Sequence, residues 1–298
     1  MRAPKDLAAS IASRLLDQAR SSGRPYDELL TYYSIERFLF RLASTPHRDR
    51  LVLKGALMLP IWGGPVARPT RDIDFLGRGS LTASDVTNIV IDSIAADVED
   101  DGMEFDASTL VVSEIREHER YGGLRATFRG RMGRSRVKMQ LDIGLGDAVT
   151  PGVIDVTYPT LLDFPAPALK GYPRETSIAE KLEAIVDLGL ANSRMKDYFD
   201  LWTLTNGHDL DGDAMVAAVR ATFERRGTAI PTAPPIGLTS TFAEDAAKQS
   251  QWSGFTRRLR AALPSLSEIV ARVAQFALPI FDGSAATRRW IAGTTWRG

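Results

Sequence analysis

Two aspartates separated by one apolar residue constrain this chain more than any other feature of its sequence. Asp72 and Asp74 alternate with Ile73 and Phe75. On a β-strand this period of two places both carboxylates on one face, roughly 6–7 Å apart at Cα, and turns the apolar pair toward a core. Adjacent carboxylates repel each other unless a cation lies between them, and Mg²⁺ prefers oxygen ligands. The pattern therefore predicts a strand that carries a divalent-metal site.

A second apolar alternation, over residues 137–143, predicts another strand. Its buried face comprises Val137, Met139, Leu141 and Ile143, and its opposite face comprises Lys138, Gln140 and Asp142. We expect Asp142 to join Asp72 and Asp74 as a metal ligand, because three carboxylates suit two metal ions about 3.5–4 Å apart, the arrangement used for in-line phosphoryl transfer. An isolated Asp-x-Asp is more often a solvated strand face or a turn, and the second aspartate-bearing strand makes the metal interpretation more specific.

A Lys-Gly pair stands where a short apolar strand, Leu51-Val52-Leu53, turns into a helix. The N-terminus of a helix offers free N–H groups to an anion, and Gly55 would let a triphosphate approach the backbone closely. The sequence contains no Gly-x-x-x-x-Gly-Lys-Ser/Thr phosphate loop. The alternative for Lys54 and Gly55 is an ordinary strand-to-helix turn.

Six short segments, which include the aspartates and the Lys-Gly pair described above, form a series of motifs along the chain. The most specific of these motifs is Arg-x-Lys-Asp-x-x-Asp-Leu at 194–201. The segments are 33–42, 51–56, 68–74, 140–144, 179–184 and 192–201. In this order they make the chain similar to the AbiEii/AbiGii-type toxin nucleotidyltransferases, a branch of the DNA polymerase β-like nucleotidyltransferase superfamily. The resemblance covers about residues 10 to 206, two thirds of the chain, and the C-terminal third carries no recognisable motif.

The resemblance implies an Mg²⁺-dependent nucleotidyltransferase, of EC class 2.7.7, that binds two metal ions and uses an NTP as its substrate. The catalytic residues that it implies are Asp72, Asp74, Asp142, Lys181 and Asp197, with Asp72, Asp74 and Asp142 as the metal ligands. The nucleotide-binding residues would be Lys54, Gly55, Arg71 and Lys181. Ala56 departs from the small polar or glycine residue that is commoner in the family at this place, so the role of the Lys54-Gly55 turn is less certain than that of the aspartates.

The toxin relatives imply an RNA acceptor, in particular the 3′ end of tRNA, so that transfer would block translation. They also imply a toxin–antitoxin system with a cognate antitoxin encoded nearby, and a role in phage defence. Two alternatives stay open. The same chemistry could modify a hydroxyl of a small molecule or a protein, or the chain could be a degenerate nucleotide-binding module.

The helical segment that follows residue 176 carries the remaining site candidates. Ser177 and Glu180 fit a capping box, which would place Lys181 about one turn inside the helix. A lone helical lysine is usually solvated. Asp197 and Asp200, three residues apart on the next helix, could instead belong to a surface ion-pair lattice. The family match favours an active-site role for Asp197 and leaves Asp200 undecided.

Cations gather between residues 120 and 141, where no acidic residue occurs: Arg120, Arg125, Arg129, Arg131, Arg134, Arg136 and Lys138. On two adjacent strands they would form a local basic track for RNA phosphates beside Asp142. The alternative is a solvated hairpin that the acidic segment 97–106 balances. Because 37 basic residues match 37 acidic ones, RNA binding must come from such a local patch.

The order of the predicted elements gives an α+β fold. A mixed-sheet nucleotidyltransferase core with flanking helices should occupy residues 1–170, and a helical region should occupy 171–298, with a Pro-rich linker near 227–237. The 298 residues include no cysteine, which excludes disulfides and thiolate metal sites and fits a reducing cytoplasm. No apolar run is long enough to span a membrane, and the N-terminus does not resemble a signal peptide. We therefore expect a cytoplasmic protein without membrane partners.

Overall fold

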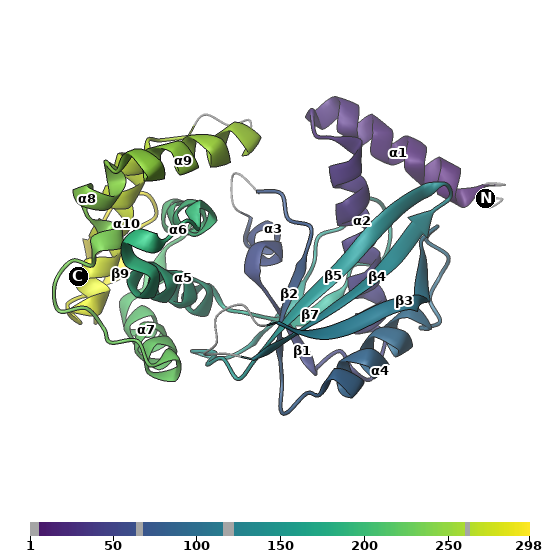
Figure 1. The fold of residues 1–298 in the computed structure, drawn as a ribbon, viewed down its shortest axis with the longest axis horizontal. Helices are drawn as coiled ribbons and strands as arrows, with labels where there is room; N and C mark the ends of the chain where they lie inside the picture. Colours follow the sequence, from purple (N-terminus) through teal and green to yellow (C-terminus); the bar gives the residue numbers. More distant parts are fainter. Residues whose placement is uncertain (1–5, 64–67, 116–121, 260–262) are drawn as a thin grey trace. The chain divides into compact units, whose positions relative to one another are not determined.

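A computed structural model describes residues 6–63, 68–115, 122–259 and 263–298 of the chain (Figure 1). These residues form two compact units. The first unit holds residues 1–62, 69–146 and 154–171, and the second holds 63–68, 147–153 and 172–298. The change of unit between Gly171 and Tyr172 lies next to the predicted boundary at 170–171, and the status of each unit as an independent domain stays a prediction.

The first unit is built on a seven-stranded mixed sheet in the order β3-β4-β5-β2-β1-β7-β6. Its strands are β1 (Leu51–Lys54), β2 (Ile73–Gly77), β3 (Glu104–Ile115), β4 (Gly123–Met132), β5 (Ser135–Leu145), β6 (Ile154–Thr157) and β7 (Ala168–Gly171). The pairs β2–β5 and β1–β7 are parallel and the other neighbours are antiparallel. The mixed sheet with flanking helices confirms the predicted α+β class. The short strand β7 was not predicted.

Helices α2 (Tyr26–Ala43) and α4 (Ala83–Ile94) contact each other and cover one face of this sheet, and α1 (Leu7–Ser22) packs against α2. The covered face is apolar because the strand residues alternate. Leu124, Ala126 and Phe128 on β4 and Met139 and Leu141 on β5 are all buried. The intervening residues, which include Arg125 and Asp142, project from the other face of the sheet.

The second unit consists mainly of helices. They are α5 (Arg174–Leu188), α6 (Met195–Gly207), α7 (Gly212–Arg226), α8 (Ser240–Ala243), α9 (Ala246–Leu259) and α10 (Leu266–Phe281), with 3-10 turns at Gly189–Ala191 and Ile236–Leu238. A small sheet of β8 (Leu210–Asp211), β9 (Arg289–Trp290) and β10 (Trp296–Arg297) closes the unit, and Trp290 and Trp296 pack on Phe276 of α10. None of the helices within the described ranges has the length and apolar character that crossing a bilayer requires.

The Pro-rich segment 227–237, predicted as a linker, belongs to the second unit. Gly237 is buried there against Ile185, and its carbonyl accepts a hydrogen bond from the hydroxyl of Tyr198 at 2.8 Å. Upstream, Arg226 at the end of α7 pairs with three carboxylates, those of Asp147, Glu180 and Glu183. These contacts hold the segment against α5 and α6, so it does not separate two parts of the unit.

Candidate active site

Four charged residues form a row on the face of the first unit's sheet that is opposite to α2 and α4. Strand register pairs Lys54 with Asp74, Asp74 with Asp142, and Asp142 with Arg125. Neighbouring strands lie about 4.8 Å apart, and residues in register point to the same face. The two central carboxylates are therefore direct neighbours, with a cationic residue on either side of them. The predicted meeting of Asp74 and Asp142 is present in the fold.

A bidentate ion pair holds one of these carboxylates. Arg125 donates from Nε to Oδ1 of Asp142 at 2.7 Å and from Nη2 to Oδ2 at 2.8 Å. The amide of Gln140 lies 3.2 Å from Oδ2 of the same group. Two parallel charge-assisted bonds fix the plane of the carboxylate as well as its position. Arg125 was predicted as a member of the basic track, and its pairing with Asp142 was not predicted, since the identity of a cross-strand partner depends on register.

The turn after β1 is shaped around the other carboxylate. Gly55 has φ +70°, and a Cβ atom added there would lie 2.8 Å from Cγ of Asp74 and closer still to Oδ2. A residue with a side chain would therefore meet both backbone strain and overlap with the aspartate. The following helical segments are short, a 3-10 turn (Gly55–Leu57) and α3 (Met58–Trp62). The glycine thus makes room for Asp74, and the predicted strand-to-helix turn is present, with a 3-10 turn as its first helical segment.

Gly55→Ala should reduce nucleotidyl transfer by about 10²-fold, because displacing a reacting group by 1 Å can cost that much. The left-handed backbone adds a stability cost of about 1–2 kcal/mol. Gly79→Ala is the matched control, since Gly79 has φ +73° but open space around it. Equal activity losses in the two variants, measured by transfer of labelled nucleotide, would show that backbone strain alone explains the effect.

Asp72 lies at a bend one residue before β2 begins, so it is not on the strand as predicted. Two residues earlier, the backbone N–H of Thr70 donates to the hydroxyl of Tyr32 on α2 at 3.2 Å and so takes no part in the pairing of the sheet. Arg71 is exposed. Period-two geometry therefore does not set the direction of the Asp72 carboxylate relative to Asp74.

The chemistry of the carboxylate row fits a hard divalent cation. Carboxylate oxygens are the ligands that Mg²⁺ takes in proteins, and Asp74 and Asp142 offer theirs side by side. A metal ion at Asp142 would share this carboxylate with the guanidinium of Arg125, which pairs with both of its oxygens. Across the residues that the structure describes, no three Asp, Glu or His side chains are gathered closely enough to form a metal site by themselves. Asp74 and Asp142 supply an adjacent pair, and the third predicted ligand, Asp72, lies two residues away along the chain.

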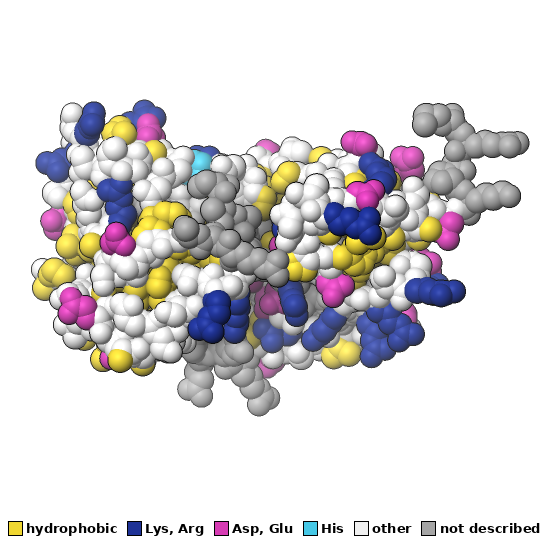
Figure 2. All heavy atoms as spheres, turned by 90° about the horizontal axis from the view of Figure 1, so that it is seen from above, with side chains coloured by type: hydrophobic (Ala, Val, Ile, Leu, Met, Phe, Trp, Pro, Cys, Tyr) yellow, Lys and Arg dark blue, Asp and Glu magenta, His cyan; other side chains and the backbone are white. Residues whose placement is uncertain are grey.

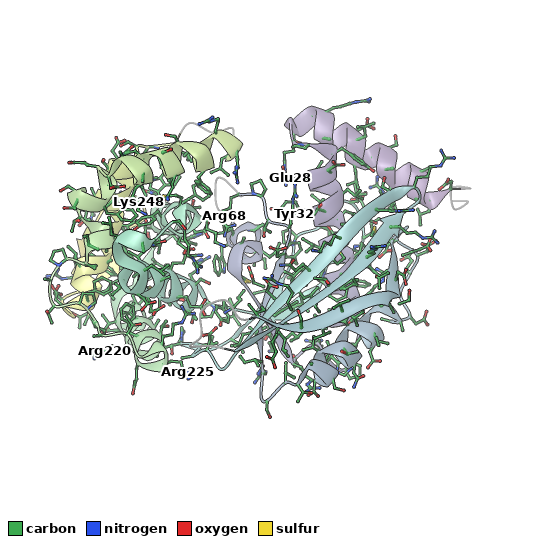
Figure 3. All side chains as sticks on the ribbon, viewed as in Figure 1. Glu28, Tyr32, Arg68, Arg220, Arg225 and Lys248 are labelled. Atoms are coloured by element: carbon green, nitrogen blue, oxygen red, sulfur yellow. The ribbon has the colours of Figure 1, made fainter. Side chains whose placement is uncertain are left out.

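A second charged cluster lies in the second unit, around Lys181 on α5. Its Nζ is 2.9 Å from Oδ2 of Asp200 and 3.4 Å from Oδ1 of Asp197, both on α6. Arg68 forms a bidentate pair with Asp200, at 2.8 and 3.0 Å (Figure 3), and Arg194 donates to Asp197 at 2.7 Å. Both aspartate side chains are only 1% exposed. Because both aspartates are buried, they do not belong to a solvated ion-pair lattice on the helix surface. Asp200, whose role the sequence left undecided, is a member of this buried cluster.

The electrostatics of this cluster fix its charges. Burial lowers the pKa of Lys181, but the carboxylates of Asp200 and Asp197 outweigh it, so the pKa is raised above its usual range. Burial raises the pKa of Asp200, but Lys181 and Arg68 outweigh it, so the net shift is downward. Lys181 is therefore a permanently protonated cation rather than a proton acceptor at neutral pH. Its chemical capacity is to stabilise negative charge.

The profile of the family described as "Nucleotidyl transferase AbiEii toxin, Type IV TA system" matches residues 37–277. The chain belongs to the AbiEii nucleotidyl transferase toxin family. The match includes Lys54, Asp72, Asp74, Asp142 and Lys181. No curated protein sequence matches the chain.

Two solved structures resemble this AbiEii family member in fold. A candidate nucleotidyltransferase from H. pylori is 16% identical, with a TM-score of 0.51, over 87% of this chain and 96% of that one. JHP933 from Helicobacter pylori is also 16% identical, with a TM-score of 0.47, over 83% of this chain and 89% of that one. At 16% identity, the first of these likenesses supports the fold alone.

In this AbiEii family member a buried lysine on α9 holds the loop that leads into α6. Lys248 is 6% exposed; its Nζ donates to the carbonyl of Asn192 at 2.9 Å and lies 5.5 Å from the ring of Phe242 (Figure 3). The side-chain oxygen of Asn192 accepts in turn from the backbone N–H of Arg194 at 2.8 Å. Lys248 is thus a positioning residue for the loop that carries Arg194 and leads to Asp197.

Lys248→Met should lower the stability by about 1–3 kcal/mol, since the buried carbonyl of Asn192 loses its donor. We also expect a several-fold lower kcat with a smaller change in the KM for NTP. Urea unfolding and steady-state kinetics measure the two effects. Arg257→Met, at an exposed position of the same helix, provides the control. A kcat equal to that of the wild type in a destabilised Lys248→Met protein would contradict the positioning role.

Proposed function

We propose that the protein transfers a nucleoside monophosphate from an NTP to a hydroxyl at the 3′ end of tRNA. The acceptor oxygen forms a bond with the α-phosphorus, the bond from that phosphorus to the β-phosphate oxygen breaks, and pyrophosphate leaves. The observation that carries the proposal is the neighbouring Asp74 and Asp142 on one sheet face of a nucleotidyltransferase family member.

The proposed roles follow from the chemistry of each group. Asp72, Asp74 and Asp142 would hold two Mg²⁺ ions, which supply Lewis-acid activation and neutralise phosphate charge when bound. Lys54, Gly55 and Arg71 are proposed to contact the nucleotide. Lys181 would contribute a fixed positive charge toward the triphosphate, and Asp197 would keep that lysine oriented through its contact at 3.4 Å.

One assay tests the acceptor. The purified protein is incubated with each of the four labelled NTPs and Mg²⁺, and with bulk tRNA, an aminoglycoside or a cell protein extract. We expect label on tRNA with one NTP preferred, and loss of that label after removal of Mg²⁺ with a chelator. Label on the small molecule or on protein would favour the alternative acceptor class. The absence of transfer to any of the three would favour a degenerate nucleotide-binding module.

The biological setting is proposed from the family. Modified tRNA 3′ ends would block translation in the cytoplasm, and a cognate antitoxin encoded nearby would restrain the toxin. A role in phage defence would follow if infection released that restraint. Growth arrest on expression of the wild type, but not of Asp74→Asn, tests the toxic activity, and co-expression of the neighbouring gene tests the antitoxin.

A further inference from the structure

Four cations lie as two like-charged pairs on the face of the first unit's sheet that is opposite to α2 and α4. Register places Arg129 directly opposite Lys138, and Arg131 directly opposite Arg136, on the antiparallel strands β4 and β5. We call these four residues the basic strip. Like charges directly opposite each other destabilise a strand pair, so the fold itself gives no reason for this arrangement. Proteins retain destabilising arrangements mainly at functional sites, and a functional site with four cations would bind an anionic ligand.

Carboxylates on β3 offset only part of this charge. Glu104 pairs with Arg131 at 2.5 Å, and Asp106 is in register with Arg129. The Oδ1 atom of Asp106, however, accepts from the backbone N–H and hydroxyl of Ser108, at 3.0 and 2.6 Å. Among the described residues, no carboxylate forms an ion pair with Arg136 or Lys138. The basic strip therefore keeps an excess of positive charge.

This excess is local. Over the whole chain 37 basic residues balance 37 acidic ones, and on the face shown in Figure 2 the Lys and Arg side chains are interspersed with Asp and Glu. The basic strip also lines two shallow hollows, of about 500 and 470 Å³, that share Arg129 and Arg136. Thr109 and Thr127 line the larger hollow and add hydroxyl groups. Cations, hydroxyl groups and a concave surface therefore lie together at the basic strip, and a polyanion can contact all three.

The same register leads from the basic strip to the carboxylate row. On this face of β5, Lys138 is followed by Gln140 and then by Asp142, and on β4 Arg129 is followed toward the row by Thr127 and Arg125. Successive rows are about 6.7 Å apart, so the strip begins about 13 Å from Asp142. This distance corresponds to about two phosphate-to-phosphate steps along an extended nucleic-acid strand.

We propose that the basic strip binds backbone phosphates of an RNA acceptor a few nucleotides upstream of its reactive 3′ hydroxyl. This inference rests on the proposed function, because it assigns the acceptor of that activity to a surface. The ligand chemistry is the phosphodiester backbone rather than the bases, since the strip offers guanidinium and ammonium groups at strand spacing. Arg134, at the turn between β4 and β5, extends the strip by one further cation. Arg120 of the predicted basic track lies outside the described residues.

The test neutralises one member of each like-charged pair. Binding of 5′-labelled bulk tRNA is measured by fluorescence anisotropy at several salt concentrations for the wild type and for Arg136→Gln/Lys138→Gln. Two lost phosphate contacts should reduce the slope of log affinity against log salt by about 1.4–1.8. The KM for tRNA should rise, and the KM for NTP should not change.

The control carries the same loss of charge elsewhere in the first unit, as Arg20→Gln/Arg78→Gln, at two exposed positions. Its slope should equal that of the wild type. The strip variant should be at least as thermally stable as the wild type, because the substitutions relieve repulsion. A lower melting temperature would assign these cations a structural role and overturn the inference.

The outcomes separate the inference from the proposed function. An unchanged salt slope in the strip variant, together with wild-type transfer to tRNA, overturns the basic strip and leaves the function standing. A reduced slope without any transfer to tRNA supports the strip as an RNA surface and rejects tRNA as the acceptor. If the wild type binds tRNA without salt dependence, the strip is overturned irrespective of the acceptor.

Discussion

Asp74→Asn should reduce nucleotidyl transfer by more than about 10²-fold, a larger loss than the 10–100-fold typical of groups that only support a metal ligand. The substitution keeps the size of the side chain and removes its charge. Asp74 is the centre of the row, in register with both Lys54 and Asp142, so its loss leaves a single carboxylate between the two cations. Transfer of labelled nucleotide at saturating NTP measures the effect.

Unfolding experiments separate this loss from a damaged fold. The substitution removes the repulsion between Asp74 and Asp142 together with the attraction between Asp74 and Lys54, so the free energy of unfolding should change by no more than about 1 kcal/mol. Asp155→Asn is a suitable control, because Asp155 is an exposed aspartate on β6 of the same unit, paired with Lys170 at 2.8 Å. A transfer rate near that of the wild type in Asp74→Asn with Mg²⁺ would show that the assigned metal ligands are wrong.

Lys181→Met should affect activity and stability together. The substitution removes the cation that contacts both Asp197 and Asp200, each buried to about 99%. Breaking a buried ion pair costs about 3–5 kcal/mol, and the value here should lie at or below the lower end because Arg68 and Arg194 still pair with the two aspartates. We expect kcat/KM to fall by about 10²–10³-fold, as for other groups that stabilise transition-state charge.

Lys181→Arg distinguishes the two contributions. It keeps the positive charge near the aspartates and should recover most of the stability, measured by urea unfolding. Because a guanidinium differs from an ammonium in geometry, it should recover less of the activity. Wild-type kinetics in Lys181→Met would reject a catalytic contribution and leave this lysine as a structural cation.

The sequence predicted the sheet residues well where one face is buried. The alternation at 137–143 predicted β5 and the direction of Asp142, because a strand with one apolar face has little freedom of register. The regular apolar spacing over about 27–42 likewise predicts a helix, and the structure has α2 at these residues. Strand β7, with four residues and no clear alternation, offered no such signal, although it pairs directly with β1.

The ends of the helices were harder to predict from the sequence than the strands. The capping box at Ser177 was wrong, because α5 begins at Arg174 after Pro173, whose fixed φ suits a helix start. Ser177 is buried inside the helix, and its hydroxyl has no partner among the described residues. The sequence pattern over 252–275 predicts one helix, whereas the structure has α9 and α10 there, with the side chain of Ser265 capping α10.

The partners of the site residues were the least predictable part. Arg125 is separated from Asp142 by a turn, and Arg68 is separated from Asp200 by 132 positions in the chain. No local pattern selects Arg68 from the other arginines, because only the tertiary fold brings it to α6. The i,i+3 spacing of Arg194 and Asp197 was a usable signal, since residues three apart on a helix are neighbours.

The parallel pairing of β2 with β5 has a consequence for the newly made chain. On the ribosome Asp74 emerges well before Asp142, and β5 can join β2 only after β3, β4 and β5 itself have been synthesised. A polypeptide released before residue 135 carries Asp72 and Asp74 but lacks the strand that completes the row. Truncated products of translation should therefore lack nucleotidyl transfer, so that the activity of this toxin family member arises only once the chain has been made through β5.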